Sequence, residues 1–582
     1  MERTRRLRLP DSEGASPAWL TLGCFGVGAT LSMGAMHAVI EPVPSLETPD
    51  PPAVHEARSF DGRFNHAGDP TRGARGRPYR RLVPFGVHAA SADLPSPRVV
   101  SNAVHAAPRV GSGPEPGATS SLFAAFGQFL GHDITLRAKR ARPRFMRVGR
   151  ADPMFPPGTL IPFAPNATHP ETGGPYNRVT AWIDGSMIYG SDRRRAMALR
   201  SFSGGRLRTG PGDQLPLHGL DHRIRQCRRP SAGFERSCLP PLENENPRRE
   251  VTSTLRLAGD VRANENPLLL SLHTIFLREH NRRAERLAEL HPEWTDETLY
   301  REARRWTGAL VQALTYHEYL PRLLGTSALS PYRGYDPEAS AEVSVAFAAV
   351  AFRFGHSQLG PTLYRLGPDG REFVNSHPSL KAAFFAPPLY DQAGGGPGAW
   401  LLGAARSAAE PIDLAVVDDM RNYMFGNLSG GLDIAAINIQ VGRDSLGAGF
   451  DALREAVGLE PLSRFEELTS DPETVRVLRR LYGTVDRVDP WVALLAEDPP
   501  ANPARDGWVG PTLRAVLVEQ FEALRDGDRF YFERDPALRG QVEALRQTRL
   551  GHVIRRNLRG RWAEATFSED AFRIPEPATP EG

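Results

Sequence analysis

The chain has 582 residues, enough for a large buried core, and its content of 40% hydrophobic and 24% charged residues is that of an ordinary soluble globular protein. The 71 Lys and Arg residues nearly balance the 68 Asp and Glu residues, so the formal net charge is only +3. Nucleic acid is therefore not an expected partner. The frequent glycines and prolines, 55 and 52 respectively, indicate many long loops.

Residues 1–40 have the order of an export signal. Several arginines (Arg3, Arg5, Arg6 and Arg8) precede a fairly apolar run over 18–40. Basic residues followed by an apolar run are typical of a signal peptide or an uncleaved membrane anchor. The alternative is a disordered cytosolic leader. The Pro-rich residues 41–57 are interpreted as a linker, and we expect an exported protein, secreted or periplasmic, that contacts a membrane only through its N-terminal segment.

The three cysteines are Cys24 in this leader and Cys227 and Cys238 in a Pro/Arg-rich loop. If the chain is exported, Cys227 and Cys238 are expected to form a disulfide that closes a short loop. In a reducing compartment they would be two unpaired surface thiols.

The rest of the chain predicts a mainly α fold: one large domain over 58–575 with long loops and few short strands. Residues 58–117 read as an extended segment that wraps a core. Ser120 is a helix cap before apolar residues spaced by three and four. Asn266-Pro267 predicts a second helix start. Further helices are predicted over 343–356, 475–482 and 513–525.

The segment 126–135 is the first along the chain that contains candidate catalytic residues. Gln128 and His132 are four residues apart and share one helix face. A neutral imidazole can act as a base and then as an acid near neutral pH. Without further evidence, the preferred interpretation of His132 is a histidine at a helix end that bonds to a backbone carbonyl.

This segment resembles the distal helix of the animal haem peroxidases, in the peroxidase–cyclooxygenase superfamily. The resemblance implies that His132 takes the proton of hydrogen peroxide, that Gln128 lies beside it, and that Asp133 binds calcium. Many members have an acidic residue directly before the histidine that forms an ester bond to the haem. Gly131 stands there in this chain, so that bond cannot form.

Residues 180–186 supply oxygen atoms at alternating positions. In extended backbone, Thr180, Asp184 and Ser186 would face one ion, with the Trp182 carbonyl between them. Calcium takes six to eight hard oxygen ligands, so Asp133 would complete the set. The alternative is a surface turn, but the continuation over 187–191 also resembles the family's calcium loop.

Arg262 lies just before the predicted helix start at Asn266. The stretch resembles the family's catalytic-arginine motif, which implies that Arg262 stabilises negative charge on a peroxide oxygen. The alternative is a surface arginine paired with Asp260. Glu265 matches a carboxylate that forms an ester with a haem methyl in several members; alternatively it only bonds at the helix start. Asn266 stands where some members have a methionine linked to the haem, so that link is excluded.

Two more histidines, His273 and His280, follow on the same predicted helix. They lack a recognised metal-binding spacing. We expect them to be helix and core residues.

The segment 351–357 resembles the family's proximal-histidine motif and implies that His356 is the axial ligand of the haem iron. Asn438 matches the partner of its second ring nitrogen. Arg353 is a candidate partner for a haem propionate. The chain departs from the family at Val441 and Ser445, where an arginine and a histidine are usual, which puts a propionate contact or a local salt bridge in doubt.

The resemblance extends from about residue 58 to about residue 572. It implies haem b, linked at most through Glu265, a calcium ion, and the oxidation of small donors such as iodide, bromide and phenols by hydrogen peroxide. Two alternatives are a fatty-acid dioxygenase of the same superfamily and a peroxidase-fold adhesion protein without turnover. Dioxygenases carry a radical-forming tyrosine three residues before the proximal histidine, where this chain has Arg353.

Overall fold

The computed structural model describes residues 57–86, 93–106, 118–218, 242–372, 377–391, 395–427 and 430–576. The predicted export segment, residues 41–56 of the linker, and Cys227 and Cys238 lie outside these ranges. Among the described residues, no helix has both the length and the apolar character needed to cross a membrane.

Helices dominate the described part of the chain, and its strands form two antiparallel hairpins, β1 with β2 and β3 with β4. The strands are β1 (Arg144–Arg147), β2 (Leu160–Phe163), β3 (Met424–Asn427) and β4 (Gly430–Leu432). The α-helices are α1 (Pro97–Val104), α2 (Ser121–Ile134), α3 (Ser186–Tyr189), α4 (Arg193–Leu199), α5 (Pro267–Leu290), α6 (Asp296–Leu314), α7 (Leu320–Leu324), α8 (Val345–Ala349), α9 (Leu380–Ala383), α10 (Pro387–Asp391), α11 (Gly396–Ala405), α12 (Asp418–Arg421), α13 (Ile434–Leu446), α14 (Phe450–Ala456), α15 (Pro472–Tyr482), α16 (Pro490–Ala496), α17 (Pro503–Asp506), α18 (Pro511–Asp526), α19 (Val542–Gln547) and α20 (Leu550–Asn557). The prediction of a mainly α domain with few short strands is confirmed.

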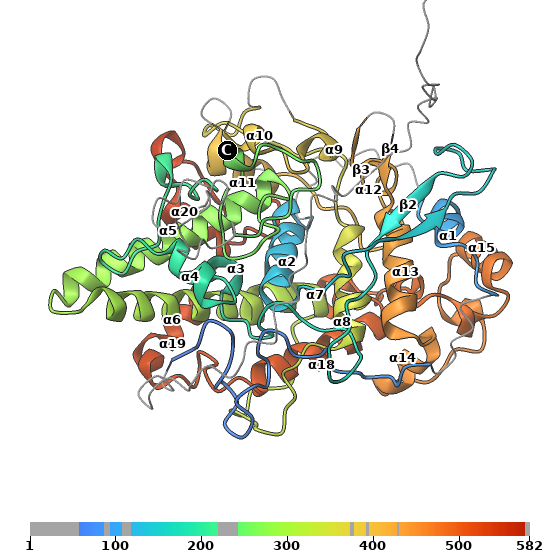
Figure 1. The fold of residues 1–582 in the computed structure, drawn as a ribbon, viewed down its shortest axis with the longest axis horizontal. Coiled ribbons are helices and arrows are strands. Elements are labelled where there is room, and N and C mark those ends of the chain that lie inside the picture. The colour runs from blue at the N-terminus through green and yellow to red at the C-terminus, as the bar shows by residue number, and fades with distance from the viewer. Residues whose placement is uncertain are drawn as a thin grey trace, which may run out of the picture.

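Helix α2 lies in the middle of the molecule, with α5 on one side and α8 and α13 on the other (Figure 1). Its apolar side chains, including Leu122, Phe126, Phe129 and Leu130, are fully buried. The aromatic rings of Phe129 and Phe276 stack at 5.0 Å and fix α2 against α5. The predicted distal segment is therefore a central helix packed on all sides.

Four predicted helices are confirmed, as α2, α5, α15 and α18. Asn266 is the N-cap of α5, since its side chain accepts a hydrogen bond from the backbone N–H of Leu269. Ser120 stands at the N-cap position of α2, but its hydroxyl donates to the Ala571 carbonyl. The Ser120 side chain therefore holds the C-terminal segment rather than capping the helix.

The single helix predicted over 343–356 is wrong. Ser344 caps α8, which ends at Ala349, and a tight 3-10 segment then runs over Ala351–His356. The two pieces are separated by Val350, whose φ of −129° and ψ of −72° are not helical. Residues 58–117 also contain the short helix α1, which the sequence pattern did not predict.

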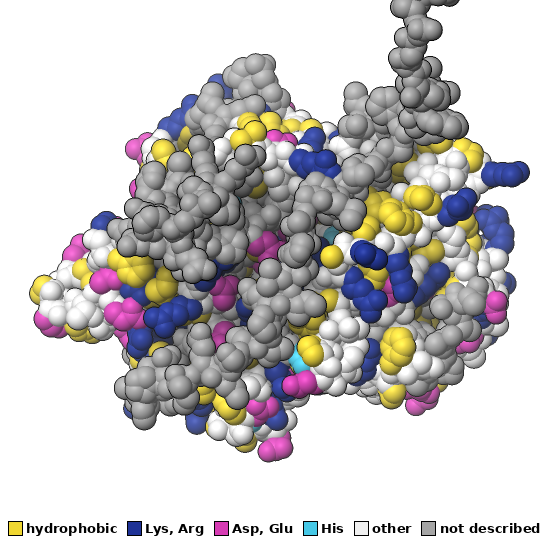
Figure 2. Space-filling view, in the orientation of Figure 1, with side chains coloured by type: hydrophobic (Ala, Val, Ile, Leu, Met, Phe, Trp, Pro, Cys, Tyr) yellow, Lys and Arg dark blue, Asp and Glu magenta, His cyan; other side chains and the backbone are white. Residues whose placement is uncertain are grey.

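The small net charge conceals one local concentration of positive charge. Exposed arginines surround the β1–β2 hairpin, together with the exposed side chains of Phe145 and Leu160. Figure 2 shows dark blue and yellow side chains together on the side of the molecule where Figure 1 places β2. On the inner face of the hairpin, Met146, Ile161 and Phe163 are buried.

Candidate active site

His132 lies in the last turn of α2 and is almost fully buried, with 6% of its surface exposed. Burial, and then the nearby Arg262 guanidinium, hold the pKa of His132 well below its usual range. Its Nδ1 has no hydrogen-bond partner among the described residues, although Asp260 Oδ1 is 3.6 Å away. His132 is therefore a neutral imidazole that is free to accept a proton at neutral pH.

Arg262 and Asp260 form a two-point ion pair beside this histidine. Arg262 Nε donates to Asp260 Oδ1 at 2.8 Å, and Nη2 donates to Oδ2 at 2.7 Å. Nη2 also donates to the carbonyls of His132 and Thr135, at 3.3 and 3.0 Å. The predicted pairing with Asp260 exists, but it is not at the surface, because Asp260 is only 2% exposed.

Two side chains from α2 and from the start of α5 are joined next to His132. Asn266 Nδ2 donates to Gln128 Oε1 at 3.2 Å. Glu265 Oε2 lies 3.9 Å from His132 Nε2. Burial, and then the charge of Glu245, raise the pKa of Glu265 to about 7. Since Asn266 is the residue that caps α5, the alternative helix-start role for Glu265 finds no support in this geometry.

On the opposite side, one amide joins His356 to Arg353. Asn438 Nδ2 donates to His356 Nδ1 at 2.7 Å, and Asn438 Oδ1 accepts from Arg353 Nη1 at 2.9 Å. Three residues make one turn of a 3-10 helix, so positions 353 and 356 lie on one face of the segment and meet the same amide. Burial, and then the Arg353 charge, lower the pKa of His356 to about 3, so this imidazole is neutral.

The loop after Thr180 brings a second carboxylate next to Asp133. Ser186 Oγ donates to Asp133 Oδ1 at 3.0 Å, and Thr180 Oγ1 donates to Asp184 Oδ1 at 3.2 Å. The predicted extended backbone is wrong here, because Gly185 takes a left-handed conformation with φ of 77° and Ser186 then begins α3. The turn, rather than strand alternation, brings these oxygens together.

Two buried carboxyl groups, of Asp133 and Asp184, therefore lie near each other at the end of α2. Burial, and then the neighbouring Asp184, raise the pKa of Asp133 to about 8, and burial also raises the pKa of Asp184. Asp184 Oδ2 is buried without a hydrogen-bond partner among the described residues. Within that part of the chain, no cluster of three or more His, Cys, Asp or Glu side chains is arranged to hold a metal ion. Trp182 is buried, and its indole N–H donates to the Gly62 carbonyl at 2.9 Å.

The segment that carries His356 packs against the helix that carries His132. The 3-10 segment contacts α2, since a Cβ built on Gly131 would lie 3.2 Å from the ring of Phe352. Arg262, Glu265, Arg353 and His356 are partly buried, and each keeps some accessible surface. The two neutral histidines therefore belong to neighbouring elements.

The two neutral histidines and the positive charge of Arg353 fit haem, whose iron takes a histidine ligand and whose propionates are anionic. Arg353 is buried near Arg137 and Arg262, and this burial and repulsion lower its pKa to about 9. No carboxylate among the described residues lies within ion-pair distance of Arg353. A buried cation without a partner is costly unless an anion joins it.

The sequence analysis gave Asp260 only as a surface partner of Arg262, and it missed Tyr79. Asp260 is buried and orients Arg262. Tyr79 comes from the extended N-terminal segment, and its hydroxyl lies 2.8 Å from Thr135 Oγ1, directly after α2. His273 and His280 are core residues, as predicted: His273 packs edge-on against Phe129, and His280 Nδ1 lies 2.9 Å from the Tyr189 hydroxyl.

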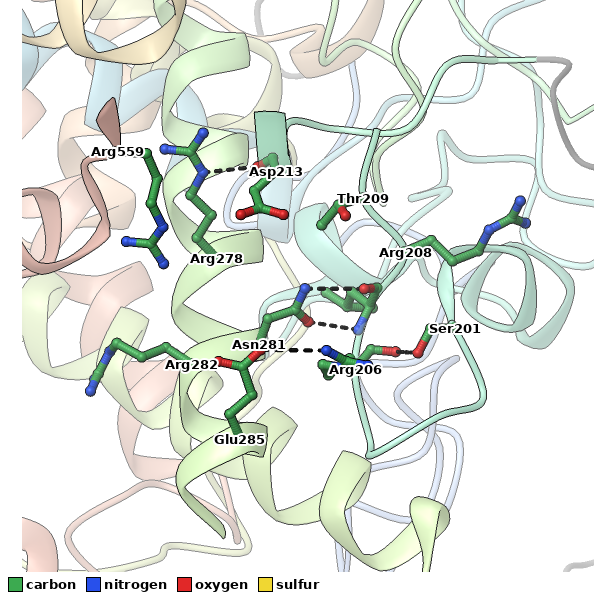
Figure 3. A pocket seen from close by; sticks show the side chains of 11 residues that line it. Ser201, Arg206, Arg208, Thr209, Asp213, Arg278, Asn281, Arg282, Glu285 and Arg559 are labelled. Atoms are coloured by element: carbon green, nitrogen blue, oxygen red, sulfur yellow. Dashed lines mark hydrogen bonds and ion pairs between the residues drawn. The ribbon is translucent and has the colours of Figure 1, made fainter. Parts of the chain in front are cut away.

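A separate pocket of about 420 Å³ lies beside α5 and is rich in arginine. Figure 3 shows Arg206, Arg278 and Arg282 on its walls. Each already has partners: Arg206 is 3.6 Å from Glu285, Arg282 is 2.8 Å from Glu279, and Arg278 donates to backbone carbonyls. The pocket contains no histidine, so its chemistry is unrelated to that of the site around His132.

Comparison with known proteins places this site in a family. The family model described as animal haem peroxidase matches residues 57–572. Peroxinectin A from Dictyostelium discoideum is 31% identical over 530 residues, which cover 86% of this chain and 93% of that protein. Human eosinophil peroxidase is 32% identical, over 89% of this chain and 76% of its own length.

Solved structures agree. Peroxidase A from Dictyostelium discoideum has a TM-score of 0.77 and 29% identity, and the match covers 89% of this chain and 99% of that chain. A fatty acid α-dioxygenase from Arabidopsis thaliana has a TM-score of 0.72 at 19% identity, over 91% of this chain and 86% of its own, and shares the fold alone. The chain therefore belongs to the animal haem peroxidase family and is an oxidoreductase that acts on hydrogen peroxide.

Proposed function

We propose that His132 and Arg262 act on hydrogen peroxide on one side of a haem whose iron is ligated by His356 on the other side. One observation carries this proposal: a neutral His132 imidazole with an unpartnered ring nitrogen lies against the Arg262–Asp260 ion pair, within 4 Å of two carboxylates. When bound, the haem supplies the redox-active iron at which peroxide is reduced.

The side chains then have distinct tasks. His132 accepts the proton of peroxide and returns it to the departing oxygen, which a neutral imidazole in an enclosed site can do. Arg262 donates to the oxygen on which negative charge develops, and Asp260 keeps it in place. Gln128, held by Asn266, lies beside His132 on the same helix face. Ligation of iron through His356 Nε2 would need the ring proton on Nδ1, so Asn438, which lies 2.7 Å from Nδ1, would present its amide oxygen to this nitrogen when haem is bound.

We propose that Glu265 links the haem through an ester with a haem methyl group. Hydrogen peroxide is the two-electron oxidant and is reduced to water, while a methyl C–H bond breaks and the Glu265 carboxylate forms the new C–O bond. Its raised pKa, its lack of a capping bond and its place beside His132 support this role. The test is to treat the holoprotein with peroxide, denature it in acid and extract it with organic solvent. Haem should stay with wild-type protein and leave Glu265→Gln; complete extraction from both would reject the ester.

We propose a calcium ion bound by Asp133, Asp184, Thr180 and Ser186 side chains and by the Trp182 carbonyl. The support is the pair of buried carboxylates with raised pKa values and an unpartnered oxygen on Asp184. A divalent cation there would remove the mutual repulsion that now favours protonation. The ion would fix the end of α2 and therefore the position of His132.

We propose iodide, bromide and small phenols as electron donors. Gln128 beside His132 matches the place where halides bind in the family. Chloride is disfavoured because Asn266 cannot form the methionine link associated with its oxidation. Steady-state assays with each donor decide this, and a chloride rate above the bromide rate would contradict the proposal.

We also propose export through residues 1–40, with mass spectrometry of the N-terminus of protein from the secreted or periplasmic fraction as the test. Fatty-acid dioxygenation is the less favoured activity, because Arg353 cannot form the tyrosyl radical that this reaction uses. Purified protein with a Soret band and peroxide-driven dye oxidation would support the peroxidase proposal. A Soret band with fatty-acid oxygenation and no dye oxidation would overturn it.

A further inference from the structure

Arg137 is a largely buried arginine whose side chain is held by neutral groups. It lies three residues beyond the end of α2, where Nη1 donates to Asn166 Oδ1 at 2.8 Å and Nη2 donates to the Ala164 carbonyl at 2.9 Å. Its Nε is buried without a partner among the described residues. Burial lowers the pKa of the guanidinium. Both of its anchors are neutral, so they fix its position without balancing its charge.

The Arg137 guanidinium lies near a second guanidinium, that of Arg353. After burial, Arg137 is the largest cause of the lowered pKa of Arg353. Asp444 and Glu245 attract Arg137, but neither carboxylate is within ion-pair distance of it. The mutual repulsion of two enclosed guanidinium groups is relieved only by an anion that reaches both.

A second connection runs from Arg137 to α13. Asn166, which holds Arg137, donates through Nδ2 to Ser445 Oγ at 2.8 Å. Ser445 and Val441 are the two α13 positions at which this chain departs from the family, which usually has histidine and arginine there. Val441 is buried and has no charge to offer. Through Asn166 and Ser445, Arg137 is therefore linked to α13, which has no guanidinium at position 441.

We propose that Arg137 binds a propionate carboxylate of the haem, together with Arg353, and thereby takes the place of the arginine that is absent at position 441. Haem carries two propionates, whose negative charges would balance the positive charges of the two guanidinium groups. Guanidinium groups bind carboxylates through charge-assisted hydrogen bonds of well-defined geometry. This inference rests on the proposed placement of haem between His132 and His356.

The test measures how fast haem leaves the protein, in the Glu265→Gln background so that no ester retains it. Transfer of haem from holoprotein to excess apomyoglobin gives the release rate. Arg137→Gln should release haem about 10- to 100-fold faster, which equals about 1.4 to 2.8 kcal/mol at 1.4 kcal/mol per factor of ten. Arg137→Lys should recover part of the loss. The matched control is Arg140→Gln, an exposed arginine on the same segment, which should release haem at the parental rate.

A second measurement separates propionate binding from a structural effect. The same proteins are reconstituted with haem dimethyl ester, whose propionates carry no charge. The esterified haem should leave Arg137→Gln and its parent at similar rates. Equal release of ordinary haem from both proteins, or an equal acceleration for both forms of haem, would overturn the role of Arg137. A parent protein without a Soret band would instead overturn the haem placement on which the proposal rests.

Discussion

The arginines on the two sides of the site differ in how their charge is balanced. Arg262 is bound at two points by Asp260 and by two backbone carbonyls. Among the described residues, the side chain of Arg353, near His356, donates to neutral acceptors only: Asn438 Oδ1 and the Ala348 carbonyl, the latter at 3.2 Å. The charge of Arg262 is balanced by a carboxylate of the chain, whereas that of Arg353 has no carboxylate partner among the described residues.

This difference separates two kinds of preorganisation. A paired arginine is already fixed in the free protein, so its hydrogen-bond donors need no rearrangement when charge develops on a substrate oxygen. An unpaired arginine instead makes the free protein less stable and the occupied protein more stable. Under the proposed function, the paired Arg262 acts on the substrate, and the positive charge of Arg353 contributes to electrostatic binding of the cofactor.

The largest expected effect breaks the reactive side. His132→Ala should lower the rate constant for reaction with hydrogen peroxide by about 100- to 10,000-fold, because a positioned acid/base group is lost. Stopped-flow absorbance of the haem band measures this. His291→Ala is the control, since His291 is a partly exposed histidine stacked on Trp294. An unchanged rate in His132→Ala would remove His132 from the mechanism.

The second effect tests the charge comparison itself. Asp260→Asn should destabilise the haem-free protein by about 3 to 5 kcal/mol, because it leaves Arg262 as an uncompensated buried charge. Arg353→Met removes a charge that is already uncompensated, so it should cost far less or raise the stability. Urea unfolding followed by circular dichroism measures both variants. Similar losses in the two variants would show that the two arginines are equally well balanced.

The third effect sharpens the reactive side through the proposed calcium ion. Asp184→Ala should abolish calcium binding and loosen the end of α2, because only one carboxylate of the pair remains. Elemental analysis of purified protein measures bound calcium, and hydrogen exchange of the amides near His132 measures the loosening. Wild-type protein without any calcium would reject the site.

The smallest effect concerns pH. The pKa of folded His132 lies well below its ordinary value of 6.5, so protonation favours the unfolded chain. The contribution of His132 to stability is full above the unfolded pKa and is lost as the pH falls toward the folded value. In protein whose Glu265 is esterified and so does not titrate, the neutral form of His132 should also keep the peroxide rate constant flat between about pH 6 and pH 8. A rate that halves at about pH 6.5 would indicate an ordinary, solvated histidine.

Much of the fold was predictable because its signals are local. The apolar spacing of α2 and the Asn266-Pro267 start of α5 need only a few neighbouring residues. The break at Val350 was not predictable, because residues 343–356 have no proline or other strong local signal of a helix end there. That break depends on the packing of the 3-10 segment against α2 and α16.

The site shows the same division. Motif resemblance predicted roles for His132, Arg262 and His356; Arg262 donates to the His132 carbonyl, and the segment that carries His356 packs against α2. The resemblance could not identify Arg137, because its proposed role depends on a contact with Asn166 and, through Asn166, with Ser445, which lies far along the chain. The left-handed turn at Gly185 likewise brings the oxygens near Asp133 together in a way that strand alternation did not anticipate.

The 3-10 turn that carries His356 also limits how this chain can evolve. Positions 353 and 356 share one amide, so a mutation at 353 changes the hydrogen bonding of the histidine as well. Arginine can only donate, which orients Asn438 with its oxygen toward residue 353. A tyrosine at 353 would remove that constraint and the positive charge in a single codon change. The guanidinium of Arg353 and the ring of His356 therefore compete for the oxygen of one amide, so a substitution at position 353 is expected to act on the histidine as well as on the local charge.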